Sequence, residues 1–173
     1  MIQLTKPDLL DRLNKLDKDA SLLHPGDGKF YITIVGGGAL ILLGYTSRST
    51  LDIDIINATQ VLYQLFEKYD MNGHVAAHMN NFPMNYESRT ILLLEGKKID
   101  FFSASLEDIA TAKLCANRAT DNEDLEVVAN KINWELLEKL AVDEDELKSN
   151  IMNDKDYFFF YENYKDYVRR FKP

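Results

Sequence analysis

Hydrophobic side chains in the first hundred residues recur with two periods, one helical and one typical of strands. A capping box that begins at Thr5 precedes four leucines at helical spacing, which predicts an amphipathic helix that ends before a turn at 24–28. Runs of β-branched and aromatic residues at 30–35 and 51–56 have the length of strands. Residues 90–102 predict a β-hairpin around a glycine-containing turn.

From Ser105 to the end of the chain the pattern is helical. In this region the predicted helices lie at 105–121, 123–131, 133–150 and 154–171. Two further helices, at 39–43 and 60–69, are predicted after the first and second strands. No repeat or low-complexity linker separates the strands from the later helices. We therefore expect an α/β (α+β) fold, with a small mixed-sheet core at 1–104 and a helical region at 105–173 packed on that core.

An aromatic stripe runs along the last predicted helix. Its members recur at helical spacing and are Tyr157, Phe160, Tyr161, Tyr164, Tyr167, Val168 and Phe171. Such a stripe is typical of a core or of a contact between two copies of a chain, so a homo-oligomer is one expected assembly. The alternative is stacking on RNA bases, with Lys165, Arg169 and Arg170 at the phosphates.

Charge and cysteine content narrow the classes of function. Twenty Lys and Arg stand against 28 Asp and Glu in 173 residues, a formal net charge of −8 at pH 7, so any general polyanion-binding surface has to be a local patch. The single cysteine, Cys115, excludes an internal disulfide and a thiolate zinc cluster. We see neither a signal-peptide pattern nor about 18 consecutive apolar residues, and expect a cytoplasmic protein with no membrane partner.

Two carboxylates in the second predicted strand carry the first chemical signal. Asp52 and Asp54 are two residues apart, so strand geometry places both on one face while the flanking isoleucines face the core. Like charges this close repel each other unless a cation joins them. Two Mg²⁺ ions would neutralise the pair, and the same ions would bridge triphosphate oxygens.

A glycine run and a third carboxylate extend this pattern. Gly36, Gly37 and Gly38 end the first strand and open a helix, which allows backbone N–H groups to approach a phosphate closely. Asp100 lies between apolar neighbours in the hairpin. If its strand lies beside residues 51–56, Asp100 completes a three-carboxylate metal site and is the candidate general base.

These residues resemble a known superfamily. Gly37-Gly38, thirteen further residues, Asp52-Ile-Asp54 and an apolar-flanked Asp100 are similar to the motif of the DNA-polymerase-beta-like nucleotidyltransferases. Within that superfamily, VGGGALILLGYTSRSTLDID resembles the abortive-infection and toxin-antitoxin type, whose motif carries an Arg before Thr-x-Asp-x-Asp. Arg48 and Thr50 stand at those positions. Gly38 departs from the pattern, because Ser or Thr often occupies that place.

The resemblance continues into the helical region and spans roughly residues 30–130. Lys113, Arg118 and the pair Asp124-Leu125 are similar to a helical motif of the same type. The resemblance implies a nucleotidyltransferase fold and transfer of an NMP from an NTP to a hydroxyl of RNA such as tRNA, of protein or of a small molecule. It also implies Mg²⁺ or Mn²⁺ as cofactor.

By the same resemblance, the metal-binding and catalytic residues would be Asp52, Asp54 and Asp100. The nucleotide-binding residues would be Gly36, Gly37, Gly38, Arg48, Thr50 and Lys113. A cognate toxin or antitoxin protein is the implied partner.

Several alternatives stay open from the sequence. Arg48 either clamps the triphosphate with its planar donor fork or pairs with a nearby carboxylate. Lys113 either reaches a phosphate or extends to solvent. The whole chain is an active transferase, a non-catalytic partner with the same fold, or an antibiotic-modifying transferase with an acidic pocket for an aminoglycoside, because fold alone does not settle function.

Overall fold

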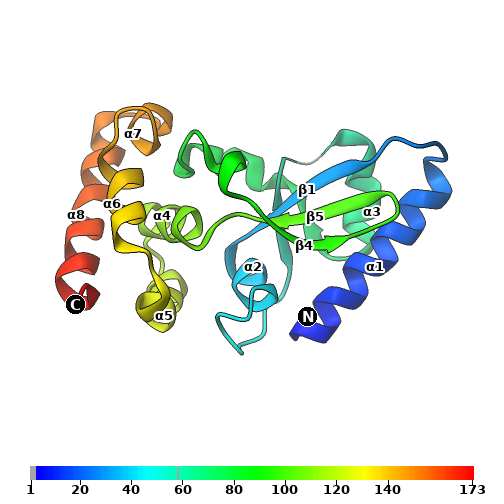
Figure 1. Ribbon diagram of the computed structural model, residues 1–173, viewed down its shortest axis with the longest axis horizontal. Helices are drawn as coiled ribbons and strands as arrows, with labels where there is room; N and C mark the ends of the chain where they lie inside the picture. Colours follow the sequence, from blue (N-terminus) through cyan, green and yellow to red (C-terminus); the bar gives the residue numbers. More distant parts are fainter. Residues whose placement is uncertain (1–2, 58) are drawn as a thin grey trace. The chain divides into compact units, whose positions relative to one another are not determined.

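A mixed sheet organises the first part of the computed structural model, which describes residues 3–57 and 59–173 (Figure 1). Its strands are β1 (Phe30–Val35), β2 (Ile53–Ile56), β3 (Met71–Asn72), β4 (Ile91–Glu95) and β5 (Ile99–Ser103). Their order is β3-β2-β1-β5-β4, with β1 antiparallel to β2 and parallel to β5. The predicted fold class, a mixed α/β structure with a helical C-terminal region, is confirmed.

The chain forms two compact units. The first contains Met1–Ala77 and Thr90–Ala104, and the second contains His78–Arg89 and Ser105–Pro173. Residues 78–89, which the sequence pattern left with the core, therefore group with the helices. Among the described residues, none of the helices has both the length and the apolar character needed to cross a bilayer.

Apolar side chains on one face of the sheet form the core of the first unit. Ile32 and Ile34 of β1 and Ile53 and Ile55 of β2 are fully or almost fully buried. Helix α1 (Lys6–Leu23) buries its leucine stripe as the sequence predicts, and α2 (Gly36–Leu42) contacts both β1 and β2. Burial of these branched side chains removes apolar area from water and fixes the strand register.

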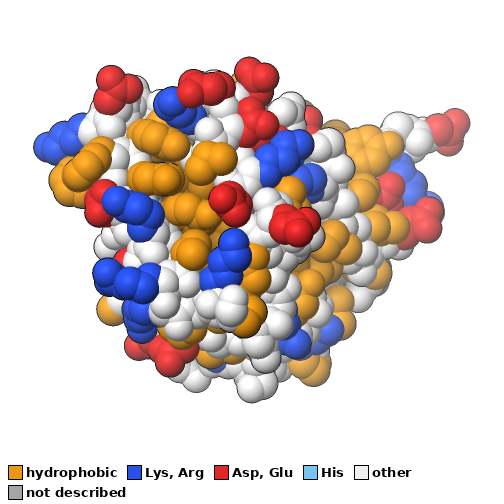
Figure 2. Space-filling view, turned by 60° about the vertical axis from the view of Figure 1, so that its left-hand side comes forward, with side chains coloured by type: hydrophobic (Ala, Val, Ile, Leu, Met, Phe, Trp, Pro, Cys, Tyr) orange, Lys and Arg blue, Asp and Glu red, His pale blue; other side chains and the backbone are white. Residues whose placement is uncertain are grey.

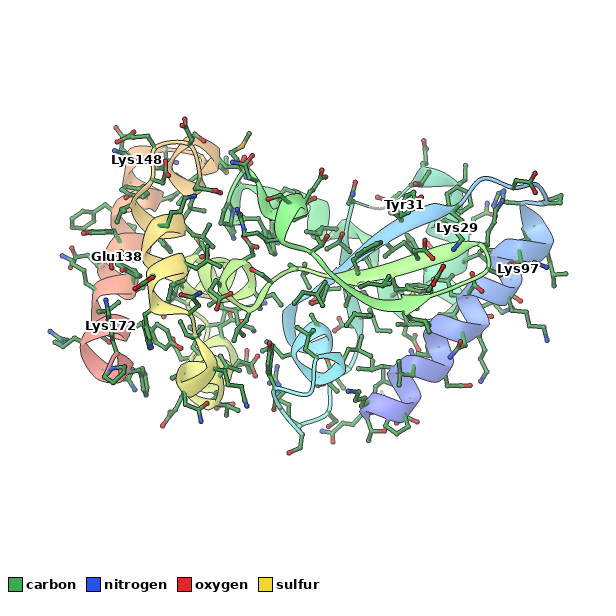
Figure 3. All side chains as sticks on the ribbon, viewed as in Figure 1. Lys29, Tyr31, Lys97, Glu138, Lys148 and Lys172 are labelled. Atoms are coloured by element: carbon green, nitrogen blue, oxygen red, sulfur yellow. The ribbon has the colours of Figure 1, made fainter. Side chains whose placement is uncertain are left out.

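One carboxylate of α1 holds the β4–β5 turn. Asp17 accepts backbone hydrogen bonds from Lys97 (2.9 Å), Lys98 (2.7 Å) and Ile99 (2.8 Å). Gly96 suits this turn, because a Cβ there would lie 2.3 Å from the Ile99 carbonyl oxygen. Figure 3 shows Lys97 at the tip of the hairpin, beside α1.

Short helical segments connect the strands where the sequence pattern is weak. They are η1 (Gln60–Leu62), α3 (Tyr63–Lys68), η2 (Gly73–Asn81) and η3 (Tyr86–Arg89). Residues 71–88 carry no clear periodicity. The 3-10 segments in this region, η2 and η3, have a different period from an α-helix, so the helical pattern in the sequence did not define them.

Helix α4 (Leu106–Ala116) contacts three other helices of the second unit. The remaining elements are α5 (Ala119–Val128), η4 (Ala129–Lys131), α6 (Trp134–Val142), α7 (Leu147–Asn150) and α8 (Asp154–Phe171). Of these, α5, α6 and α8 contact α4. The predicted helix at 105–121 ends early because Asn117 adopts a left-handed backbone (φ 48°) that caps α4.

The aromatic stripe of α8 packs inward. Phe160, Tyr164 and Tyr167 are buried, and the Tyr167 hydroxyl donates a hydrogen bond to the Leu125 carbonyl at 2.8 Å. The expectation of core packing is thus confirmed for these three rings. Phe158 and Phe159 point away from this core and are exposed, and Figure 2 shows hydrophobic side chains on the surface of this unit.

Candidate functional site

Asp54 is fixed by the strands on both of its sides. It lies opposite Val35 of β1 and opposite Asn72 of β3. The Asn72 side-chain amide donates a hydrogen bond to Asp54 Oδ1 at 3.0 Å. Asp54 is half-buried, whereas Ile53 and Ile55 on either side of it are completely buried. Alternation along β2 therefore holds this carboxylate on the polar face of the strand.

Asp52 immediately precedes β2 and is exposed. It is two residues from Asp54, which is the spacing of side chains on one side of an extended segment. The Thr50 hydroxyl donates a hydrogen bond of 3.2 Å to the Asp52 carbonyl oxygen. Thr50 also forms an isolated antiparallel bridge with Leu4. In this structure Thr50 therefore positions the backbone that carries Asp52.

The glycine run packs against two charged side chains. Gly36 has a φ of +66°, and a Cβ at this residue would lie 2.9 Å from Asp54 Oδ2. A Cβ at Gly37 would lie 2.6 Å from Arg48 Nη2. At Gly38 a Cβ would meet the Asp52 carbonyl oxygen at an ordinary 3.7 Å. The turn therefore places a carboxylate and a guanidinium over two consecutive glycines.

Asp100 lies away from these two carboxylates, which corrects the expected three-carboxylate cluster. β5 pairs with β1 and not with β2, and Asp100 is level with Tyr31 while Asp54 is level with Val35. Four residues along a strand and two interstrand spacings separate the two acids by roughly 16 Å. The sequence could not reveal this, because strand order is not encoded in hydrophobic alternation.

Lys29 pairs with Asp100 instead. Lys29 Nζ lies 2.9 Å from Asp100 Oδ1 and 3.6 Å from Glu95 Oε1. The hydrogen bond to Asp100 raises the pKa of Lys29. Figure 3 shows Lys29, which immediately precedes β1, and Tyr31 of β1 beside the β4–β5 hairpin. Asp100 therefore belongs to an ion-pair group with Lys29 and Glu95.

Lys113 belongs to the second unit, where it is 7% exposed. Its Nζ lies 2.8 Å from Asp121 Oδ1 and 2.7 Å from Asp124 Oδ2. Arg118 Nε donates a further hydrogen bond of 2.7 Å to Asp121. Lys113 thus joins α4 to α5 within its own unit and does not extend to solvent.

A comparison with known protein families decides the classification. Residues 11–172 match the family described as "Nucleotidyltransferase of unknown function (DUF6036)". The chain belongs to this family. No curated protein and no solved structure matches the DUF6036 chain. The family agrees with the nucleotidyltransferase resemblance that the glycine run and the Asp-x-Asp pair indicated.

The donor atoms of this DUF6036 protein suit a metal ion carried by a substrate. Among the described residues, no group of three or more His, Cys, Asp and Glu side chains could hold a metal ion. Asp52 and Asp54 supply hard carboxylate oxygens, and Mg²⁺ is commonly held by one or two carboxylates together with substrate phosphates. The two acids therefore fit a metal–triphosphate complex.

Asn72 is the contact that the sequence analysis missed. Its amide holds Asp54 Oδ1, while Oδ2 of the same carboxylate faces Gly36. The pairing of β2 with β3 covers only two residues on each strand. A strand this short leaves no periodic signal, so nothing in the sequence pointed to Asn72.

Proposed function

We propose that this DUF6036 protein is a metal-dependent nucleotidyltransferase that moves an NMP from an NTP to a hydroxyl acceptor. The observation that carries the proposal is the arrangement over the glycine turn, where Asp54 lies against Gly36 and Arg48 lies against Gly37. Membership of a nucleotidyltransferase family supports the same reaction class.

Opposite charges at one turn suit a metal-bound triphosphate. The Arg48 guanidinium is a planar fork that matches phosphate oxygens in a bidentate manner. Asp54 and Asp52 would hold Mg²⁺ or Mn²⁺, which when bound would offset phosphate charge and polarise the reacting oxygens. Positioning and charge neutralisation are the main contributions of proteins to phosphoryl and nucleotidyl transfer.

The chemical step is a displacement at the α-phosphorus. The acceptor oxygen forms a bond to this phosphorus, the bond to the oxygen that bridges to the β-phosphorus breaks, and pyrophosphate leaves. The acceptor proton passes to solvent or to a carboxylate. Asp52 is the candidate for the latter, because it is exposed and lies two residues before Asp54 in the chain.

The biological setting we propose is a toxin-antitoxin or phage-defence pair with a cognate protein partner. The support is the similarity of VGGGALILLGYTSRSTLDID to the abortive-infection type of nucleotidyltransferase. Within that setting the acceptor is an RNA such as tRNA, a protein or a small molecule.

A non-catalytic partner protein with the same fold is the second candidate. One observation favours it: Asp100 is engaged by Lys29 and stands apart from Asp52 and Asp54. The presence of three acidic residues therefore does not by itself argue for retained catalysis. A non-catalytic protein can still bind nucleotide at the glycine turn.

A label-transfer assay distinguishes the two candidates. The protein is incubated with each α-labelled NTP, Mg²⁺ or Mn²⁺, and tRNA, cell protein or an aminoglycoside as acceptor. Asp54→Asn removes the charge and keeps the shape of the side chain, and Asp11→Asn on the surface of α1 is its matched control. We expect label transfer that disappears only with Asp54→Asn. Nucleotide binding without transfer to any acceptor would support the non-catalytic candidate.

A further inference from the structure

Exposed apolar side chains gather where α8 begins, in the second unit. Met152, Phe158 and Phe159 are 73%, 59% and 54% exposed. Met152 and Phe159 line one cavity, and the rings of Phe158 and Phe159 have centroids 6.1 Å apart. We call these three residues the α8 patch. Figure 2 shows hydrophobic side chains gathered on the surface of this unit. Apolar side chains that cluster on a surface, unlike scattered ones, are typical of an interaction site.

A cavity of about 340 Å³ opens beside the α8 patch. Ile151 and Cys115 continue its apolar lining. Burial raises the pKa of the Cys115 thiol to about 12, which keeps this side chain uncharged at neutral pH. The polar members of the wall are Asn81, Asn117, Asp156 and Asn163. A cavity of this size has room for one large apolar side chain, and anchors of that kind dominate the affinity of protein–protein contacts.

The segment that carries the α8 patch is strongly acidic. Residues 143–159 contain six Asp and Glu and two Lys, so these 17 residues carry −4 of the formal net charge of −8. Glu146 is buried and paired with Arg89, whereas the other five acids are at least partly exposed. One of the two lysines, Lys148, is paired with Glu144. The exposed surface of this segment is therefore negative.

Contacts among α6, α7 and α8 bring these acids to the patch. The Tyr157 hydroxyl donates a hydrogen bond of 2.9 Å to the Ala141 carbonyl oxygen, which joins α8 to the end of α6. Lys148 of α7 lies over the Tyr157 ring, with its Nζ 5.7 Å from the ring centroid. Asp156 lines the cavity itself. The acidic segment thus lies beside the first turns of α8.

The sign of this charge selects the kind of partner. A negative surface repels nucleic acids and anionic lipid headgroups. A second copy of the chain would bring the same acids together at a two-fold contact, where like charges oppose association. A protein with lysine or arginine beside an apolar side chain suits both the charge and the cavity. Lys155 Nζ lies 5.8 Å from the centroid of Phe159, so this ring already accepts an ammonium group.

We propose that the α8 patch and its cavity form a docking site for a cationic amphipathic helix of a partner protein. An apolar side chain of that helix enters the cavity at Met152 and Phe159, and its basic side chains face Asp154 and Asp156. Amphipathic helices commonly bind by placing an apolar face in a groove. The proposal does not depend on the transfer reaction, because all of these residues belong to the second unit, whereas Asp54 belongs to the first.

Two model peptides test the class of partner. Each is a labelled helical peptide with leucine along one face, and the other face carries lysine in the first peptide and glutamate in the second. Fluorescence anisotropy measures their binding to the full chain at low and at physiological salt. We expect the lysine peptide to bind about tenfold more tightly than the glutamate peptide, by a ratio that shrinks as salt rises. Equal affinities would overturn the proposal.

Phe159→Ala assigns this binding to the α8 patch. Val127→Ala is its matched control, because Val127 is an apolar residue of the same unit with similar exposure (53%). Loss of an aromatic contact at the centre of an interface should weaken binding of the lysine peptide about tenfold, and the control should leave it unchanged. Trp134 fluorescence checks that both variants are folded. Equal affinity of the two variants for this peptide would place the binding elsewhere and overturn the site.

Variants without charge test the acidic edge of the site. Asp145→Asn with Asp154→Asn removes two exposed charges from the acidic segment, and Glu123→Gln with Glu126→Gln removes two from the exposed side of α5. The first pair should weaken binding of the lysine peptide about threefold or more, as expected for exposed ion pairs, and the second pair should have a smaller effect. Equal effects would show that the peptide responds only to net charge, which contradicts the proposal.

Self-association and membrane binding are the competing uses of this surface. Wild type and Phe159→Ala should sediment alike in velocity experiments, and neither should bind phosphatidylserine vesicles. A dimer that Phe159→Ala dissociates would assign the α8 patch to a second copy of the chain. Vesicle binding that Phe159→Ala abolishes would assign it to a membrane. Either result overturns the partner proposed for this site.

Discussion

The carboxylate of Asp54 lies where a side chain at Gly36 would have to be. Only 2.9 Å separates Asp54 Oδ2 from the position of a Cβ at Gly36. Gly36 also has a left-handed backbone (φ 66°), a conformation that residues other than glycine rarely adopt. The first glycine of the run therefore fixes the candidate site by being small and by allowing this backbone conformation.

Gly36→Ala should damage both stability and nucleotide binding. The left-handed backbone costs about 1–2 kcal/mol for alanine, and the new methyl group displaces the Asp54 carboxylate. Chemical denaturation and a triphosphate-binding titration measure the two effects. Gly28→Ala is the control, since a Cβ there meets no atom within 4 Å. Wild-type binding by Gly36→Ala would contradict the role given to this contact.

Asp100→Asn should retain label transfer, in contrast to Asp54→Asn. Asp100 is level with Tyr31 at the other end of β1 and is paired with Lys29, so its charge is remote from the proposed reacting groups. The transfer assay with both variants side by side measures the difference. Equal loss of transfer in the two variants would show that Asp100 acts in the reaction after all.

Arg89 should be essential for the stability of the second unit. Its guanidinium bonds to Asp108 (2.8 Å) and to Glu146 (3.0 Å), and both carboxylates are almost completely buried. Arg89→Met would leave two buried acids without their cation, at a cost of about 3–5 kcal/mol. Arg89→Lys should fall between wild type and Arg89→Met, because an ammonium cannot reproduce the planar fork.

The fluorescence of Trp134 can be used to measure the stability of the two Arg89 variants. It is the single tryptophan of the chain, lies in the second unit and packs against Tyr167 with ring centroids 5.4 Å apart. Urea unfolding followed by its fluorescence therefore reports on that unit. Unchanged midpoints in both Arg89 variants would contradict the prediction.

The second unit should lose stability in acid partly through Asp121. Burial opposes the ionisation of this carboxyl, but hydrogen bonds from Arg118 and Lys113 outweigh burial and lower the pKa of Asp121 in the folded chain. A lowered folded pKa contributes stability above the ordinary value of about 3.9, and this contribution is lost as pH falls through the folded pKa.

Asp121→Asn tests this pH dependence. The variant should be less stable than wild type at pH 7, and the difference should shrink as pH falls below about 4. Urea unfolding followed by Trp134 fluorescence at a series of pH values gives both curves. Parallel curves across the acid range would show that Asp121 does not contribute to the acid sensitivity.

Local signals in the sequence predicted the elements better than their arrangement. The leucine stripe before residue 24 and the FYITIV strand each reflect contacts between near neighbours in the chain, and both elements formed as predicted. The helix that begins after Ser105 also formed, although it ends at Ala116. The position of Asp100 depends on the parallel pairing of β1 with β5, whose partners are about seventy residues apart. Hydrophobic alternation does not specify that pairing.

The candidate site shows the same difference between local motifs and tertiary contacts. The glycine run and the Asp-x-Asp pair are short motifs, so their residues could be named from the sequence. Which side chains meet over the turn depends on tertiary packing: Arg48 lies against Gly37, and Asn72 lies on an edge strand of two residues.

Binding of Mn²⁺ in the presence and absence of a non-hydrolysable triphosphate tests the central claim most directly. Electron paramagnetic resonance counts the bound ions in wild type, Asp54→Asn and the surface control Asp11→Asn. We predict Mn²⁺ binding that requires the triphosphate and is lost only in Asp54→Asn. Binding that is unaffected by Asp54→Asn, or no binding at millimolar Mn²⁺ and triphosphate, would contradict the proposed site.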